Sequence, residues 1–372
     1  MSTTKVLEAA SSLSRGNQRM LLSGAVFLVL GLVIYANIYA LLVVTATLTL
    51  AWYGLDLIRQ HTKEKVDPSG KYVFITGCDS GFGLESAKVI RDLGFMVIAG
   101  CYNDNSPGAK ELRARPWVKK VEVVSLDVSN EASVMACAEE VKAICSDQGL
   151  WAVINNAGIN SMGPVEIVTM QMYQRCAEVN LFGPIRVTKS VLPLIRQAQG
   201  RIINVTSERA YNPRAQSSPY CLAKAGLTIF SECLSREMAE FKVKVITVAP
   251  GEFAGATAIV KPEVSVGLQD SLLQAQSTLS LQDQKSPLYS KENIETIVKS
   301  FQIATQVSGT SSEPVIQAYI DAVLNENPQS CYLVHGFKRQ CLDPYILLIR
   351  CRGFVPESLM PTVERILFFF LK

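Results

Sequence analysis

The sequence predicts an α/β fold in which helices cover both faces of a parallel β-sheet. Short apolar runs alternate with amphipathic stretches, and a glycine-rich turn follows the first run directly. Runs spaced in this way leave room for the helical crossovers that parallel strands require. A chain of 372 residues can bury a substantial core, as one large domain or two small ones. Strands are expected at 72–75, 96–99, 121–125, 152–154, 201–205 and 243–248.

Composition disfavours several classes of function. The net charge is +3, with 36 Lys and Arg against 33 Asp and Glu spread along the chain, so no concentrated basic surface for nucleic acid is expected. The two histidines, His61 and His335, are too few for a typical histidine-rich metal site, and no metal is expected. The ten cysteines form no CxxC pattern. We expect buried reduced thiols, with disulfides or metal ligands as the alternative, and hence a reducing compartment.

The apolar run at 21–58 is predicted to be a membrane segment, since its single charged residue is Asp56. As one helix it would measure about 57 Å, nearly double the ~30 Å hydrocarbon core of a bilayer. A hairpin of two short helices that breaks near Ala36 and Asn37 is therefore favoured, with one long tilted span as the alternative. Cationic residues flank the run on both sides, as a hairpin with cytoplasmic ends requires: Arg15, Arg19, Arg59, Lys63 and Lys65.

The neighbouring segments complete the expected domain organisation. Residues 1–20 form a tail that weakly resembles a mitochondrial transit sequence. No cleavage site closes the run at 21–58, so we expect it to persist as an anchor. A linker at 59–69 precedes the main domain at 70–336. An apolar extension at 337–372 ends in ERILFFFLK, which is too short to span a bilayer.

The glycine-rich turn, TGCDSGFG at 76–83, joins the first expected strand to a helix. Gly77, Gly81 and Gly83 would let the backbone turn tightly and approach a pyrophosphate, whose charge the first amides of the helix would meet. Three glycines alone are also consistent with a purely structural turn. The strand–turn–helix context favours a dinucleotide cofactor.

The end of the second strand favours NAD over NADP. An NADP site needs a cation for the 2′-phosphate, but AGCYNDN at 99–105 contains no Arg or Lys, and the glycine-rich turn contributes Asp79 instead. NAD is therefore expected and NADP is disfavoured. The usual acidic partner of the ribose is absent, and Cys101 stands near its place. Asp127, after the third strand, is placed either to meet the adenine or to cap the next helix.

Further motifs follow in order along the chain. NNAG at 155–158 ends the fourth strand, AEVNLFG at 177–183 lies in the next helix, and NVTS at 204–207 ends the fifth strand. SPYCLAK at 218–224 places a tyrosine four residues before a lysine on one helix face. Together with TGCDSGFG, and at this spacing, these motifs resemble the short-chain dehydrogenase/reductase family. The resemblance extends over residues 70–336.

This resemblance implies a Rossmann-type, doubly wound parallel sheet in a single catalytic domain at 70–336, preceded by the membrane anchor. The segments 311–324 and 331–336 would form a late helix and the last parallel strand. The four catalytic residues that it assigns are Asn180, Ser207, Tyr220 and Lys224. The residues expected to bind the cofactor are Gly77, Asp79, Ser80, Gly81, Gly83, Asp127, Asn156, Ala157, Gly158, Tyr220, Lys224, Pro250, Gly251 and Thr257. Thr257 is chosen because Gly255 occupies the usual threonine position of the family.

Physical chemistry supports these roles. Lys224 lies about 6 Å beyond Tyr220 along the helix, where its ammonium group would favour the phenolate. Lowering the pKa of a phenol from about 10 to about 7 corresponds to about 4 kcal/mol, which the lysine and a positive nicotinamide ring could supply together. Ser207 would hold the substrate oxygen, and Asn180 would position a water linked to the lysine. Taken alone, a tyrosine and a lysine four residues apart would be ordinary helix geometry.

Finer details resemble the branch of the family that contains retinol, type 2 17β-hydroxysteroid and mitochondrial D-3-hydroxybutyrate dehydrogenases. A hydroxy acid needs a cation for its carboxylate, and Arg209 and Arg214 are the candidates. Ser217 stands where a basic residue is expected in a hydroxybutyrate enzyme. With an apolar lid at 258–281, we expect a hydrophobic secondary alcohol or ketone of steroid or retinoid type. The alternatives are a D-3-hydroxybutyrate dehydrogenase of a mitochondrial membrane and a non-catalytic NAD-binding membrane protein.

The expected partners are a small hydrophobic alcohol or ketone and the lipid bilayer, and not nucleic acid. The resemblance implies a homodimer or a homotetramer. A membrane location is expected, with the endoplasmic reticulum favoured and a mitochondrial membrane as the alternative. The glycosylation sequon at Asn204 is discounted, because it falls on an expected buried strand.

Overall fold

The computed structural model describes most of the chain. The described residues are 5, 26–35, 37, 39–40, 43–48, 50–51, 54, 64–114, 121–257, 262–280, 289–296, 298–299, 311–336, 349 and 362. The chain divides into two compact units, Met1–Glu64 and Lys65–Lys372.

In the first unit, the described residues 26–35 are helical and exposed. A search of the described residues finds no helix that combines the length and the apolar character needed to cross a membrane. Much of the expected membrane segment at 21–58 lies outside the described residues, as do nearly all of the tail at 1–20 and of the extension at 337–372. These three assignments stay predictions.

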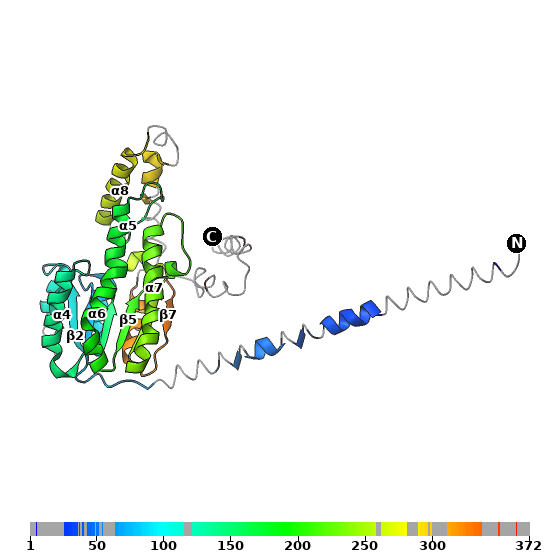
Figure 1. The fold of residues 1–372 in the computed structure, drawn as a ribbon, viewed down its shortest axis with the longest axis horizontal. Coiled ribbons are helices and arrows are strands. Elements are labelled where there is room, and N and C mark those ends of the chain that lie inside the picture. Colours follow the sequence, from blue (N-terminus) through cyan, green and yellow to red (C-terminus); the bar gives the residue numbers. More distant parts are fainter. Residues whose placement is uncertain are drawn as a thin grey trace. The chain divides into compact units, whose positions relative to one another are not determined.

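The second unit contains a parallel sheet of seven strands in the order β3-β2-β1-β4-β5-β6-β7 (Figure 1). The strands are β1 (Tyr72–Thr76), β2 (Met96–Cys101), β3 (Val121–Ser125), β4 (Ala152–Asn155), β5 (Arg201–Val205), β6 (Lys244–Pro250) and β7 (Cys331–Val334). All seven expected strands are confirmed, with ends that differ by at most two residues. The order reverses between β1 and β4, so a crevice opens at the carboxyl ends of these two strands.

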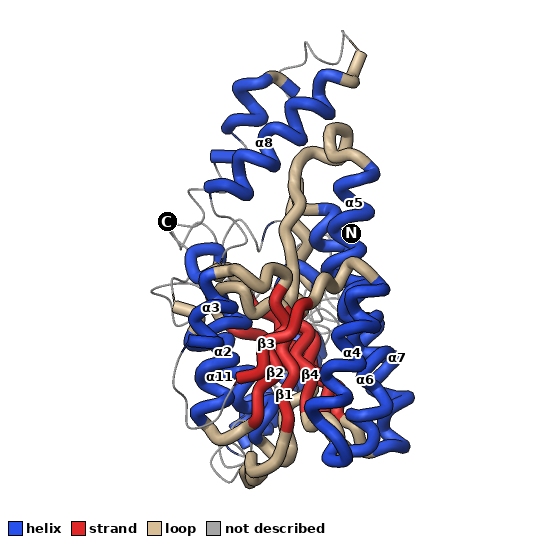
Figure 2. Tube along the Cα trace, turned by 90° about the vertical axis from the view of Figure 1, so that its left-hand side faces the viewer, coloured by secondary structure: helices blue, strands red, loops and turns tan. Residues whose placement is uncertain are grey.

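Helices cover both faces of this sheet (Figure 2), with α2, α3 and α11 on one face and α4, α6 and α7 on the other. Successive side chains of β1 point to opposite faces of the sheet. Phe74 belongs to the core cluster on one face and Ile75 to the cluster on the other. The helices are α2 (Gly81–Asp92), α3 (Pro107–Ala114), α4 (Glu131–Cys145), α5 (Met170–Ala177), α6 (Gly183–Gln197), α7 (Ser218–Met238), α8 (Pro262–Ser277) and α11 (Glu313–Leu324).

Short irregular helices connect these elements. They are η1 (Ser146–Gln148), η2 (Glu178–Phe182), η3 (Glu208–Ala210), η4 (Ala239–Phe241) and η5 (Ala254–Ala256). The described cysteines are free, and six of them are buried. This agrees with the expectation of reduced thiols, while Cys341 and Cys351 lie outside the described residues.

Helix α8 extends beyond the carboxyl ends of the strands, beside the start of α5 (Figure 1). Leu272 and Ala275 of α8 pack with Ile167 and Val168 in a small apolar cluster that is separate from the two sheet cores. The expected lid at 258–281 is thus helical over Pro262–Ser277, and its buried apolar residues belong to a separate small core.

Helix α11 is tied to the sheet and to the loop that follows β4. The hydroxyl of Tyr319, a fully buried residue, donates a hydrogen bond of 3.1 Å to Oδ1 of Asn156. The guanidinium of Arg201 donates to the carbonyls of Ala322 and Asn325 at 2.8 and 2.7 Å. These bonds hold the late helix against residues more than a hundred positions earlier in the chain.

We predict that Tyr319→Phe lowers the free energy of unfolding by about 1–2 kcal/mol, because it removes the hydroxyl that satisfies the Asn156 side chain. Urea denaturation measures this change. Tyr102→Phe is the matched control, since Tyr102 is 72% exposed, and it should stay within about 0.5 kcal/mol of the wild type. Equal stabilities for the two variants would contradict the assigned role of the hydroxyl.

Candidate active site

A cavity of about 1490 Å³ lies at the carboxyl ends of the strands. Small-molecule sites span roughly 300–1,000 Å³, so this cavity has room for both a dinucleotide and a substrate. Of the predicted site residues, all except Gly83 and Asn180 line it. These two residues are buried and do not line the cavity.

Gly83 closes the glycine-rich turn. A Cβ at Gly83 would lie 2.2 Å from the carbonyl oxygen of Gly77, and a Cβ at Gly77 would lie 2.8 Å from Cα of Ala157. Gly77 also has a φ of +73°, which favours glycine. The backbone thus packs too closely for side chains, and the first residues of α2 border the cavity, as pyrophosphate binding requires.

Asn156 connects the glycine-rich turn to the loop that follows β4. Its Nδ2 donates to the carbonyl of Thr76 at 2.8 Å, and its backbone N–H donates to the Thr76 hydroxyl at 3.0 Å. The neighbouring Asn155 donates to Oδ1 of Asn204 at 2.8 Å across the β4–β5 pair. Asn155 thus ties the two strands together. Asn204 is fully buried, which agrees with discounting the sequon there.

Asn180 lies in η2, a π-helical turn between α5 and α6. π-helical turns frequently occur at functional sites. The Asn180 amide donates to the carbonyl of Ile159 at 2.7 Å and accepts from the Ile159 N–H at 2.9 Å. A Cβ at Gly158 would lie 3.1 Å from Oδ1 of Asn180 and 3.7 Å from Nζ of Lys224. The asparagine therefore fixes the loop after β4 and lies near the lysine.

Lys224 and Tyr220 lie on one face of α7, as predicted. Nζ of Lys224 is 5.8 Å from the centre of the Tyr220 ring and donates to the carbonyl of Val205 at 2.7 Å. Burial lowers the pKa of Lys224 to about 8, so the ammonium form still prevails at neutral pH. The side chain can therefore act as a fixed cation beside the phenol.

Burial also raises the pKa of Tyr220 to about 12, although a hydrogen bond with Ser207 and the charge of Arg209 lower it. Among the protein's own groups, desolvation thus outweighs the favourable hydrogen bond and charge. The expected pKa of about 7 also depends on the nicotinamide ring, so it stays a prediction. A phenol with a pKa of about 12 needs about 7 kcal/mol to become phenolate at neutral pH.

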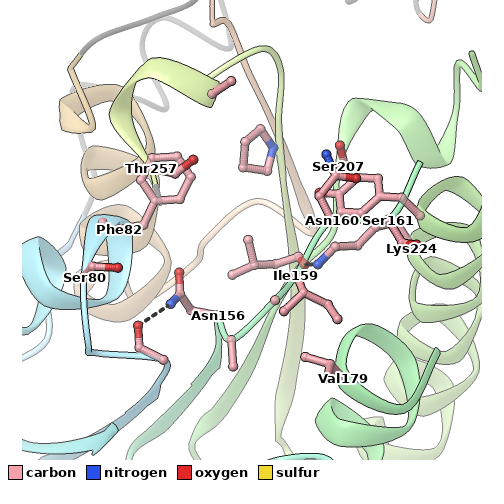
Figure 3. A pocket seen from close by; sticks show the side chains of 18 of the residues that line it. Ser80, Phe82, Asn156, Ile159, Asn160, Ser161, Val179, Ser207, Lys224 and Thr257 are labelled. Atoms are coloured by element: carbon pink, nitrogen blue, oxygen red, sulfur yellow. Dashed lines mark hydrogen bonds between the residues drawn. The ribbon is translucent and has the colours of Figure 1, made fainter. Parts of the chain in front are cut away.

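Figure 3 shows the two sides of the cavity. Phe82 and Thr257 lie on one side, Ser207 and Lys224 on the other, and Asn156 between them. Thr257 lines the cavity, whereas Gly255 does not. The choice of Thr257 over the usual position is consistent with this placement.

Asp127 lines the cavity but does not cap a helix. The side chain that caps α4 is Asn130, which accepts a hydrogen bond of 3.1 Å from the N–H of Ser133. Asp127 accepts instead from the N–H of Ser129 at 2.9 Å, in a local turn. The capping alternative is therefore wrong, and the adenine contact stays a prediction.

The two candidate arginines are held by glutamates. Arg209 lies 3.0 Å from Glu252 and 3.6 Å from Glu208. Arg214 lies 2.7 Å from Glu208 and 3.4 Å from Glu252. Nη1 of Arg209 also donates to the hydroxyl of Ser217 at 3.3 Å, so a cation does reach the position that lacks one in the sequence.

Sequence reasoning missed several residues of the cavity wall. Phe82 and Phe253 meet edge to face, with ring centres 5.8 Å apart, and Asn160 and Met162 line the cavity after the NNAG loop. These residues lie in loops or at a helix start, where no periodic pattern marks them. The PG dipeptide at 250–251 was the one signal that pointed to the loop of Phe253.

Comparisons with known proteins identify a family profile and several relatives that match this chain. A family profile described as short chain dehydrogenase matches residues 71–265. The chain is 34% identical over 286 residues to "D-beta-hydroxybutyrate dehydrogenase, mitochondrial" of Rattus norvegicus, which covers 76% of this chain and 82% of that protein. It is 32% identical over 287 residues to "Estradiol 17-beta-dehydrogenase 2" of the same species, covering 77% and 73%. It is 41% identical over 208 residues to "Retinol dehydrogenase 16" of Homo sapiens, covering 56% and 62%.

The fold has a counterpart among solved structures. A short-chain dehydrogenase from Streptomyces avermitilis superposes with a TM-score of 0.60 at 22% identity, covering 80% of this chain and 98% of that chain. The likeness at this identity concerns the fold. Because the profile and the long alignments agree with the sheet order and the placement of the catalytic motifs, the chain belongs to the short-chain dehydrogenases, oxidoreductases that act on CH–OH groups.

Proposed function

We propose that this enzyme is a membrane-anchored, NAD-dependent oxidoreductase that interconverts a hydrophobic secondary alcohol of steroid or retinoid type and its carbonyl. The observation that carries the substrate class is the pairing of Arg209 and Arg214, the two arginines of the loop after β5 that line the cavity, with carboxylates. Arg209 and Arg214 each contact the two carboxylates of Glu208 and Glu252. A buried substrate carboxylate needs a cation whose charge is not already neutralised. A neutral alcohol makes no such demand.

Tyr220 is proposed as the acid and base of the reaction. In alcohol oxidation, its phenolate would accept the proton of the substrate hydroxyl, and Ser207 would hydrogen-bond the same oxygen. Lys224, fixed by the carbonyl of Val205, keeps a positive charge near the phenolate. NAD, when bound, supplies the hydride acceptor and a positively charged ring.

The choice of NAD rests on Asp79. Its carboxylate accepts hydrogen bonds of 2.8 and 2.9 Å from the N–H groups of Tyr102 and Asn103, just past the end of β2. The acid that the sequence lacks at the end of this strand is thus brought there by the glycine-rich turn. A carboxylate in this position can accept from a ribose hydroxyl and repels a 2′-phosphate.

The anchor at 21–58 is proposed from the sequence and from exposure in the first unit. The described residues Val26–Tyr35 include Phe27, which is 75% exposed, and Leu28, which is 67% exposed. A helix whose apolar side chains are exposed suits a lipid environment. A lipid alcohol as substrate favours the endoplasmic reticulum. The hydroxybutyrate alternative would place the enzyme in a mitochondrial membrane.

The alternative activity, D-3-hydroxybutyrate oxidation, has one observation in its favour. Arg209 reaches Ser217, next to the helix that carries Tyr220, and one of the relatives is named for that substrate. A non-catalytic NAD-binding role is the third possibility. Assembly as a homodimer or homotetramer stays a prediction, which the exposed apolar residues Leu222 and Ile229 on α7 support.

The reaction is tested with the purified full chain, NAD and a panel of steroids, retinoids and hydroxy acids, by following NADH absorbance. We expect oxidation of lipid alcohols and at least a roughly 100-fold lower kcat for Tyr220→Phe. Tyr72→Phe, at the amino end of β1, is the matched control and should retain activity. Faster oxidation of 3-hydroxybutyrate would overturn the substrate class alone. NAD binding without any turnover would favour the non-catalytic role.

Cofactor choice is tested by Asp79→Arg, which replaces the repelling carboxylate with a cation. The ratio of kcat/KM for NADP to that for NAD should rise about 10-fold or more. Asp79→Asn removes the charge and keeps an acceptor oxygen, so it should give an intermediate ratio. An unchanged ratio in both variants would show that Asp79 does not discriminate between the cofactors.

Anchoring is tested by carbonate extraction of membranes that contain the full chain. The wild type should stay in the pellet, and the double variant Leu30→Asp/Val33→Asp should shift to the supernatant, because each buried charge costs about 3 kcal/mol. Fractionation against marker enzymes identifies the membrane. Extraction of the wild type itself would refute the anchor while leaving the reaction in place.

A further inference from the structure

Four charged side chains form a partly buried cluster beside Tyr220. Glu208 and Arg209 come from η3, Arg214 follows in the same loop, and Glu252 comes from the loop after β6. The side chain of Glu208 is 1% exposed, and those of Arg209 and Glu252 are 15% exposed each. Two positive and two negative charges balance, so the cluster can persist away from water.

Within this cluster, Arg209 contacts the catalytic Ser207 and the residue that directly precedes the helix of Tyr220. Its backbone N–H donates to the hydroxyl of Ser207 at 3.2 Å. Its Nη1 donates to the hydroxyl of Ser217, the residue at the start of α7, three positions before Tyr220. The N-terminus of a helix disfavours a cation. Glu252, 3.0 Å from Nη2 of Arg209, compensates for this unfavourable position.

Resting on the proposed function, we propose that Arg209 is a positioning residue for proton transfer, whose positive charge favours the deprotonated form of Tyr220, and that Glu252 limits this effect. The guanidinium keeps its charge at every pH that the enzyme meets, because Glu252 and Glu208 outweigh burial and raise its pKa. Lys224 differs, since burial lowers its pKa to about 8. Arg209 therefore persists as a cation in the alkaline range where the lysine loses its charge.

Several groups face Tyr220 from the surrounding elements. The hydrogen bond with Ser207 and the charge of Arg209 lower the pKa of Tyr220, whereas burial, Cys176 of α5 and Glu252 raise it. Lys224 approaches the ring from α7, and Tyr319 of α11 interacts with Tyr220 electrostatically. Among these groups, Arg209 and Glu252 contact each other, and their charges change the pKa of Tyr220 in opposite directions. Single substitutions at these two positions must therefore shift the proton affinity in opposite directions.

The test is the pH dependence of kcat/KM for alcohol oxidation, which rises as Tyr220 loses its proton. Arg209→Met should move this rise to higher pH by about one unit, and Glu252→Gln should move it to lower pH, since each removes one neighbouring charge. Arg209→Lys should return the profile towards that of the wild type. The double variant Arg209→Met/Glu252→Gln should lie between the single variants. Arg236→Met, an exposed site on α7, controls for the loss of an arginine elsewhere.

A second readout separates this inference from the proposed function. Ultraviolet difference titration of tyrosinate, with the Tyr220→Phe variant subtracted, reports the proton on Tyr220 without turnover. If no alcohol is oxidised but the titration shifts in opposite directions in the two single variants, the inference stands and the proposed function falls. If both variants keep the wild-type titration, or shift it in the same direction, the inference is wrong. Circular dichroism identifies variants that do not fold. If a single variant does not fold, the titrations of Arg209→Lys and of the charge-balanced double variant test the inference in its place.

Discussion

Burial of Tyr220 is the constraint to which the rest of the site responds. Burial raises the pKa of this phenol to about 12 even though Ser207 and Arg209 lower it, and such a value is unsuitable for a base near neutral pH. Each neighbour therefore matters by its charge or hydrogen bond: Ser207 and Arg209 favour the deprotonated form, and Lys224 holds an ammonium group 5.8 Å from the ring centre. A water-exposed tyrosine would have an easier ionisation but no protected place for hydride and proton transfer.

The scaffold keeps these groups in place with bonds that cross between elements. Lys224 is anchored to the end of β5 through Val205, and Asn180 clamps the loop after β4 through Ile159. Asn156 and Tyr319 extend this network to the glycine-rich turn and to α11. The carboxyl ends of the central strands, the cofactor turn and the late helix are thus one connected structure, in which a shift of one part displaces the others.

The sequence predicted the parts of the site that depend on residues close together in the chain. A turn with Gly77 and Gly83 between a strand and a helix favours a dinucleotide site, and a tyrosine and a lysine four residues apart on a helix share one face. It did not reveal that Asp79 reaches past the end of β2, or that Glu252 meets Arg209. These contacts join residues 23 to 43 positions apart across separate loops, and neither spacing nor composition marks such pairs. The desolvation that raises the pKa of Tyr220 was not visible in the sequence for a related reason, because its extent depends on the assembled core.

Overall identity also cannot decide the substrate. Relatives named for a hydroxy acid and for a steroid are 34% and 32% identical to this chain over similar lengths. Discrimination depends on a few side chains beside Tyr220, where a carboxylate is accepted only if a cation remains without a partner of opposite charge. Here Glu208 and Glu252 pair with Arg209 and Arg214, and this pairing supports the proposal of a neutral lipid alcohol.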